Sequence, residues 1–496
     1  MSDSSSLGNI GAHQALTGDM MLGLKPSAPR SRAYRVSIAP NNKQIFGPTD
    51  CIYIDIPTSR PNTWYDPAQS YLKFSVQCSA TAACNTTDGI YCDNSAYSFI
   101  SRLDVYNGSN LLETLSQYGA LCNTILDVTL TESDKAGLSN VIGTNPLNYS
   151  TYTAPVAFAA NAVSAVKCVQ SMGDRSGLML KAVEAAGGIG AAIPQTFCLP
   201  LMSGIVGINA SKMIPVGNLR APISLQLYTA ANDDAIFYGV AGAGAKWQIV
   251  NVEFVATYVE ILDDAFSQHF DPSIPQYIST KSWRESSFSI PANTGGENTS
   301  LLSFRMASIT NILGRFRNKT SVVQGVTASA SYRLSSSVNP SMAYYYFKVG
   351  SQIYPNKPVY CFNTGLTGNG SEAFSELLKS FHSLDTMHGN SALIYSQYNV
   401  SAETFGNWTV PFGCGLKSAG VIDTSNNAFC IGQEFESFCH KSDTILSGLS
   451  TLNTNLFFTY GITAGVDTGA APITAEFYAQ YDLILVLQDG YISAKY

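Results

Sequence analysis

The chain has few charged residues. Only 13% of its 496 residues are Asp, Glu, Lys or Arg, whereas about 25% is usual in soluble proteins. The net charge of −7 excludes a globally basic nucleic-acid-binding protein. An uncharged, tyrosine-rich surface is typical of proteins that bury it in an obligate assembly, although Ser, Thr and Asn side chains can also keep such a surface hydrated. The composition favours the buried interface.

Targeting segments are missing too. The chain starts Met1-Ser2-Asp3 without a basic and apolar leader, which predicts synthesis in the cytoplasm with no signal peptide. No run of about 18 apolar residues is free of polar residues or proline, so a transmembrane helix is not expected. The eleven cysteines form no C-x-x-C pair. Cys51, Cys78 and Cys198 lie in apolar, strand-like runs and are predicted to be small buried side chains.

Motifs of catalysis and metal binding are equally scarce. The five histidines show no ligand spacing such as H-E-x-x-H; they are His13, His269, His382, His388 and His440. Cys439 directly precedes His440, and adjacent side chains on a strand point to opposite faces, so the two do not form a nucleophile and its base. There is no G-x-S-x-G elbow. We therefore expect a protein that is not an enzyme and holds no catalytic residue, metal or cofactor.

A strand pattern that occurs twice is the clearest feature present. The pattern E-F-x-A-x-Y spans Glu253–Tyr258 and recurs 223 positions later at Glu476–Tyr481. Apolar residues alternate around both copies, which predicts strands with one buried face. Phe254 and Phe477 should point inward and the two glutamates outward. The offset is too long for a solenoid unit of about 20 to 50 residues, so it predicts two similar β domains in tandem, each closed by its last strand.

The order of the other elements supports the duplication. Alternating runs at Ile52–Ile56 and Leu72–Val76 predict antiparallel strands. The turn Asn107-Gly108 is followed by a predicted helix that starts at Asn110, with Glu113 completing its cap; its stripe is Leu112, Leu115, Tyr118 and Cys122. In the second half, Asn369-Gly370 precedes a predicted helix with the stripe Phe374, Leu377, Leu378 and Phe381. Residues 129–195 and 386–427 lack periodicity and predict long surface loops.

The first 45 residues differ from the rest in charge. They are rich in Ser, Gly and Pro and contain five cations, namely Lys25, Arg30, Arg32, Arg35 and Lys43. Such a segment is predicted to be a flexible arm. Its cations can hold phosphate groups electrostatically, or they can simply keep a tail in solution. The sequence leaves both readings open.

Several short motifs, taken in order, resemble those of the double jelly-roll major capsid proteins. A Tyr65-Asp66-Pro67 turn leads into the strand Tyr71–Phe74, and the strand that closes the first domain runs into Ile261-Leu262-Asp263-Asp264. In the second domain, Arg315-Phe316-Arg317 follows an early strand, and the final strand Tyr481–Leu485 is followed by Asp489-Gly490. The resemblance covers roughly residues 45–496. Such proteins tile shells of double-stranded DNA viruses, from tailless phages and adenoviruses to virophages, polinton-like viruses and large algal viruses.

The resemblance implies an all-β fold of two tandem eight-stranded jelly rolls with short helices and long surface loops. It places the jelly rolls at residues 46–268 and 269–496, after the arm at 1–45. It further implies a major capsid protein, located in the virion and made in the host cytoplasm. Its partners would be itself, as a homotrimer that looks hexagonal and contacts neighbouring capsomers, and the penton and minor capsid proteins. The arm would face the interior and contact genome DNA or an internal membrane.

Two other functions compete with this one. A β-sandwich carbohydrate-binding or adhesion protein would share the strand pattern, but it would ordinarily be exported. An enzyme on a β-sandwich or cupin-like scaffold would need a cluster of histidines or carboxylates, which this sequence does not supply.

Overall fold

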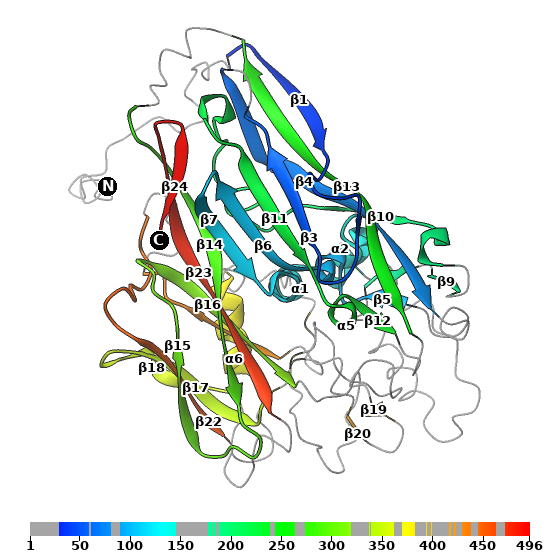
Figure 1. The fold of residues 1–496 in the computed structure, drawn as a ribbon. Helices are drawn as coiled ribbons and strands as arrows, with labels where there is room; N and C mark the ends of the chain where they lie inside the picture. Colours follow the sequence, from blue (N-terminus) through cyan, green and yellow to red (C-terminus); the bar gives the residue numbers. More distant parts are fainter. Residues whose placement is uncertain are drawn as a thin grey trace, which may run out of the picture.

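The computed structural model describes residues 29–58, 61–80, 90–144, 177–180, 182–184, 188–238, 244–262, 273–318, 337, 339–361, 370–381, 393, 398, 416–417, 421–422, 429–437, 445–462 and 472–496. They form two β sandwiches that stand side by side (Figure 1). All five histidines and the pair Asp263-Asp264 lie outside the described residues.

The first sandwich consists of two antiparallel sheets. One has the order β1 (Ser31–Ile38), β13 (Lys246–Ile261), β4 (Thr63–Ala80) and β10 (Gln195–Leu199), with the short strands β2 (Ile45–Phe46) and β9 (Ala182–Glu184) added. The other has the order β3 (Cys51–Ile56), β11 (Ile223–Thr229), β6 (Ile100–Asn107) and β7 (Asn110–Ser116). A small third sheet joins β12 (Ile236–Tyr238), β5 (Ile90–Cys92) and β8 (Met179–Leu180).

The second sandwich repeats this plan. Its first sheet has the order β14 (Gln276–Ile290), β23 (Ile473–Gln488), β16 (Ile309–Asn318) and β21 (Cys430–Glu434), and β24 (Tyr491–Lys495) pairs with β23. Its second sheet has the order β15 (Glu297–Leu302), β22 (Leu456–Ile462), β17 (Met342–Val349) and β18 (Gln352–Tyr360). A separate pair joins β19 (Leu416–Lys417) and β20 (Val421–Ile422).

Strand order identifies both halves as jelly rolls. If the eight long strands of each half are counted along the chain, the two sheets read 1-8-3-6 and 2-7-4-5 in both halves. Eight antiparallel strands divided in this way between two facing sheets are the jelly-roll arrangement. The predicted fold of two tandem jelly rolls is therefore confirmed, and E-F-x-A-x-Y is the eighth strand of each.

The longest described helix of each half occupies the equivalent position in the order of elements. In both, the helix follows the fifth strand: α1 (Tyr118–Thr129) comes after β7, and α6 (Ser371–Ser380) comes after β18. The remaining helical segments are short: α2 (Glu132–Gly137), α3 (Ser139–Ile142), α5 (Asn232–Ala235), η4 (Ala96–Phe99), η6 (Ile189–Ala191) and η7 (Val216–Asn218). The helix predicted after Gly370 is confirmed. The one predicted from Asn110 is wrong, because Asn107-Gly108 turns the chain into β7 and the helix starts only at Tyr118.

Alternating burial produces the cores. Ile52, Ile54 and Ile56 on β3 are at most 2% exposed, as the period-2 pattern predicts. On β13 the alternation shifts at Asn251, whose φ of 54° marks a bulge opposite β4. Val250, predicted on the inner face, is therefore only half-buried, while Ile249 before the bulge is buried.

Three further expectations need correction. The flexible arm predicted for residues 1–45 does not extend that far, because residues 31–38 form β1 and pair with β13 along their whole length. The predicted turn Tyr65-Asp66-Pro67 lies within β4, where residues 67–70 bulge out of the ladder with β13. Among the cysteines, Cys78 is buried as predicted, but Cys51 and Cys198 are only half-buried.

Candidate functional site

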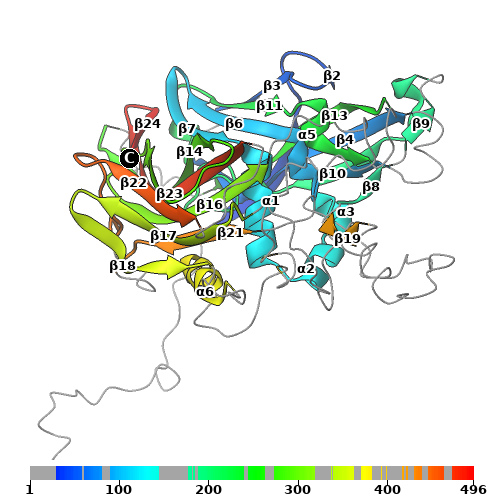
Figure 2. The same cartoon turned by 90° about the horizontal axis from the view of Figure 1, so that it is seen from below.

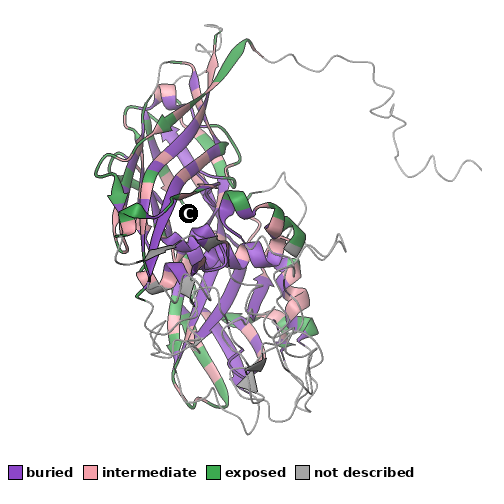
Figure 3. Cartoon of the chain, turned by 90° about the vertical axis from the view of Figure 1, so that its right-hand side faces the viewer, coloured by how far each residue is buried: buried purple, intermediate pink, exposed green. Residues whose placement is uncertain are grey.

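The junction between the sandwiches contains several deeply buried charged side chains. Phe254 and Phe477 point into their cores, as predicted. Glu476, however, is not on a solvated face: it is 1% exposed, and its neighbour Tyr478 is fully buried. The reason is that the outward face of the sheet holding β23 and β16 lies against α1 of the first sandwich (Figure 2). Burial at this junction is continuous between the two halves (Figure 3).

A cluster of charges closes this face. The Nε atom of Arg315 lies 3.4 Å from Oε2 of Glu476, and Arg317 pairs with the other carboxylate oxygen. Nη1 of Arg315 also donates to the carbonyl of Ala120 in the first turn of α1, at 3.4 Å. Burial raises the pKa of nearby Glu285, and the Glu476 carboxylate raises it further. Because a buried charge is tolerated only with partners, this cluster fixes the helix of one sandwich against the sheet of the other.

Glu113 makes a second link. It is buried on β7 and accepts a hydrogen bond from the backbone N–H of Gly204 at 3.1 Å. The hydroxyls of Ser203, in the first sandwich, and Ser282, on β14 of the second, donate to the same carboxylate. Burial raises the pKa of Glu113 above its usual value of 4.5. The sequence predicted a helix-capping role for this residue; instead it joins the two halves.

The C-terminal hairpin forms a third link. Asp489 and Gly490 have φ values of 52° and 80°, which suits the tight turn between β23 and β24. The backbone N–H of Ile492 donates to Oδ1 of Asn107 at 2.8 Å, and the side-chain amide of Asn110 donates to the Ile492 carbonyl at 3.1 Å. The hairpin is thus hydrogen-bonded to the turn between β6 and β7 of the first sandwich.

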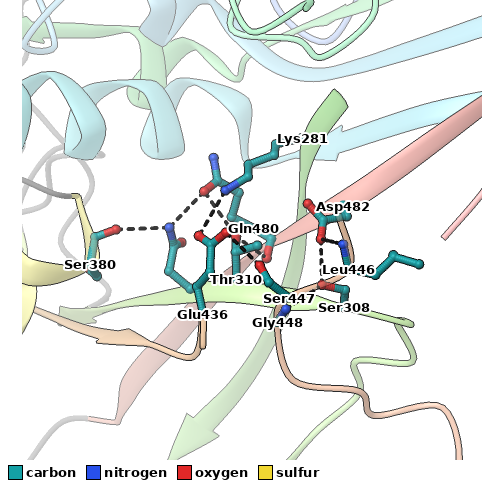
Figure 4. A network of polar contacts seen from close by, with 11 residues as sticks. Lys281, Ser308, Thr310, Ser380, Glu436, Leu446, Ser447, Gly448, Gln480 and Asp482 are labelled. Carbon is teal, nitrogen blue, oxygen red and sulfur yellow. Dashed lines mark hydrogen bonds and ion pairs between the residues drawn. The ribbon is translucent and has the colours of Figure 1, made fainter. Parts of the chain in front are cut away.

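A polar network holds residues 435–437 and 445–449 on the second sandwich (Figure 4). Lys281 on β14 lies 3.2 Å from Glu436, which also accepts a hydrogen bond from Ser447. The Ser308 hydroxyl donates to Asp482 at 2.6 Å. These contacts hold the described residues that follow β21 and precede β22 against the second sandwich.

The structure does not gather the basic residues predicted for the arm. Lys25 lies outside the described residues. Arg30 precedes β1; Arg32 and Arg35 are exposed on it, with Arg32 4.0 Å from Glu260. Lys43 pairs with Asp50 at 2.7 Å. Exposed pairs of this kind contribute about 0 to 1 kcal/mol each. These four cations are therefore spread along the sandwich and do not form a cluster.

Two other kinds of site are absent from the described residues. Across the part of the chain that the structure describes, no three His, Cys, Asp or Glu side chains are grouped so that they could hold a metal ion. Within the same residues, no helix combines the length and the apolar character needed to span a bilayer.

Comparison with known proteins identifies the fold. No protein-family model and no curated protein matches the sequence. Among solved structures, the Faustovirus major capsid protein is similar over 96% of this chain and 93% of its own, with 10% identity and a TM-score of 0.58. The PBCV-1 virus capsid matches over 96% and 98%, with 9% identity and a TM-score of 0.56. A chain of the Sputnik virophage matches over 98% and 93%, with 12% identity and a TM-score of 0.53. The chain therefore has the double jelly-roll fold of viral major capsid proteins.

Proposed function

We propose that this chain is a major capsid protein that self-assembles into homotrimeric capsomers and, through them, into an icosahedral shell. The observation that carries the proposal is the double jelly roll itself: two sandwiches with one strand order, fastened to each other by buried charges. The Faustovirus protein of the same fold is a major capsid protein by name. The low charge of the chain supports a role in which much of the surface is covered.

Closed symmetry explains why two joined sandwiches suit this role. Three chains, each with two similar lobes, give a unit with six corners, which can pack against six neighbours and tile a curved sheet. Cyclic symmetry also lets one sequence bury the same surface three times over. A rigid junction between the two sandwiches is required, because a hinge there would let the shape of the trimer vary. The junction around Glu476 and Glu113 provides that rigidity.

The remaining expectations are part of the same proposal. The protein would be made in the host cytoplasm, reside in the virion and act without catalysis. Neighbouring capsomers, penton proteins and minor capsid proteins would be its partners. The N-terminal residues would face the particle interior and contact genome DNA or an internal membrane. The position of β1 is consistent with this orientation, because Ser31 pairs with Ile261 at the end of the sheet opposite Ala80, so the N-terminal residues enter the sandwich from one end only.

Native mass measurement tests the proposal. A trimer of the 53.1 kDa chain should appear at about 159 kDa, with dissociation and unfolding occurring together, because large obligate interfaces lack a stable separated subunit. Electron micrographs should show hexagonal particles. A stable 53.1 kDa monomer that never forms trimers or shells, and that binds a glycan, would instead support the carbohydrate-binding or adhesion function.

A further inference from the structure

A lysine of the first sandwich is buried in a polar cluster beside α1. Lys135 on α2 is 8% exposed, and a lysine is almost never buried unless its charge is paired. Its Nζ atom donates to Oδ1 of Asp127, which lies near the end of α1 and is 4% exposed. The two helices follow one another on the same side of the sandwich (Figure 2). The cluster therefore holds an amine that is shielded from bulk water.

A side-chain amide contacts the same carboxylate oxygen. Nδ2 of Asn94, just before η4, donates to Oδ1 of Asp127 at 3.1 Å, and Asn94 is 4% exposed. The amine of Lys135 and the amide of Asn94 are thus neighbours that share one acceptor. An amine can replace the nitrogen of a carboxamide when a carboxylate carries the proton from the attacking nitrogen to the departing one. The three groups needed for that exchange meet here.

The backbone next to both reacting side chains is held in place. Nδ2 of Asn123 on α1 donates to the carbonyl of Asp93 at 3.0 Å, which ties the residue before Asn94 to that helix. Asn94 has a φ of 68°, a left-handed conformation that asparagine adopts more readily than most residues. The hydroxyl of Thr144 donates to the carbonyl of Lys135. Reacting groups held in this way lose little entropy when they approach each other.

The backbone at Gly177 covers the cluster from another side. Its N–H donates to the carbonyl of Cys92 at 2.8 Å. A Cβ atom on Gly177 would lie 3.0 Å from the carbonyl carbon of Asn94, so only a glycine allows the two segments to approach this closely. Water is thereby kept away from the amide carbon, and exclusion of water favours attack by the neighbouring amine over hydrolysis.

We propose that Lys135 and Asn94 become joined by an isopeptide bond. Asp127 takes a proton from the Lys135 ammonium group, and the amine attacks Cγ of Asn94. The bond from Cγ to Nδ2 then breaks as Asp127 returns the proton to the departing nitrogen. The lysine nitrogen loses one more proton, which leaves with the ammonia as ammonium. One amide replaces another, Asp127 is regenerated, and the reaction needs no oxidant, reductant or cofactor.

The bond links α2 to the segment before η4 and so closes a loop that contains β6, β7 and α1. Closing a long loop restricts the unfolded chain and thereby stabilises the folded one. The cysteines among the described residues are all free, so in that part of the chain the isopeptide bond is a covalent link that thiol reductants do not cleave. The inference is independent of the capsid proposal, which stands or falls on the oligomer.

Intact mass measurement of the purified protein tests the bond. The wild type should be about 17 Da lighter than its sequence requires, because ammonia is lost when the amine acts as the nucleophile. Lys135→Arg keeps a cation beside Asp127 but has no amine, so this control should have its full mass and an unchanged circular dichroism spectrum. Comparing the two proteins cancels any processing of the chain that they share.

Tryptic digestion locates the bond. The wild type should yield residues 74–102, which include Asn94, joined to residues 103–167, which remain uncleaved at Lys135. Asn94→Asp releases water in place of ammonia, so its loss should be about 18 Da, and Asp127→Asn should lack the bond. Wild-type protein of full mass that is cleaved at Lys135 would overturn the proposal. A wild-type loss of about 18 Da would overturn it too, because the lysine would then have condensed with a carboxyl group.

Discussion

The contact between Gly314 and Phe477 allows the packing of the second core to be tested in detail. A Cβ atom on Gly314 would lie 2.7 Å from Cε1 of the Phe477 ring and 2.9 Å from Cγ1 of Ile431. Gly314→Ala should therefore overpack the core and cost about 1 to 3 kcal/mol. Phe477 is fully buried and its ring centroid lies 4.6 Å from that of Phe458. Phe477→Ala should cost about 3 to 5 kcal/mol, through lost burial and the cavity that remains.

The double variant decides whether this reasoning holds. With the ring gone, the new methyl group on residue 314 loses its closest clash and fills part of the cavity, and Ile431 gains room to shift away from the methyl group. The double variant should cost about as much as Phe477→Ala alone, which corresponds to a coupling of about 1 to 3 kcal/mol. Urea unfolding at one fixed protein concentration measures the losses, because the stability of an oligomer depends on concentration. Additive losses, or a neutral Gly314→Ala, would refute the packing described for this strand.

Three further predictions follow from the junction and the N-terminal residues. Glu476→Gln should cost about 3 to 5 kcal/mol of unfolding free energy, because it leaves buried arginines without their anion. Glu253→Gln removes the half-exposed partner of Lys73, which lies 3.1 Å away, and should cost less than about 1 kcal/mol. Equal losses would contradict the difference in burial. Burial raises the pKa of Glu113 above 4.5, so ionising this carboxyl group disfavours the folded state as the pH rises above 4.5. The stability of the wild type relative to Glu113→Gln should therefore increase on going from about pH 7 to about pH 5. A stability difference that does not depend on pH would count against this prediction. Protease added to intact particles should spare Arg30, and rapid trimming there before disassembly would place the N-terminal segment outside.

Local patterns predicted the parts of the fold that local chemistry controls. The alternation at Ile52–Ile56 predicted β3 because a strand with one buried face needs an apolar residue at every second position. The repeat around Phe254 and Phe477 predicted two closing strands because both copies fill equivalent places in equivalent cores. The family resemblance then supplied the jelly-roll arrangement, which the strand order confirms.

Features that depend on distant segments could not be predicted in this way. Leu112 and Leu115 are three residues apart, a spacing that favours a helix, whereas in the structure they lie on a strand whose pairing with β6 is interrupted by a register shift between Leu111 and Glu113. Residues 31–38 have the composition of a basic tail. They form a strand because they pair with β13, which lies more than two hundred residues later in the chain. Glu476 has the pattern of a solvated residue, and its burial comes from α1 of the other sandwich. The buried arginine at position 315, where the first half has lysine, was the available signal, since the planar guanidinium suits buried pairs.

The attachment of the C-terminal hairpin to the first sandwich has a consequence for folding during translation. Chains emerge from the ribosome with their N-terminal parts first, and domains fold in that order. All strands of the first sandwich have been made once Ile261 is synthesised, so that half can fold early. The hydrogen bonds of Ile492 to Asn107 and Asn110 form only after every strand of both sandwiches has been translated. The third link between the halves is thus completed last, and a chain interrupted before β24 would have only the links at Glu476 and Glu113.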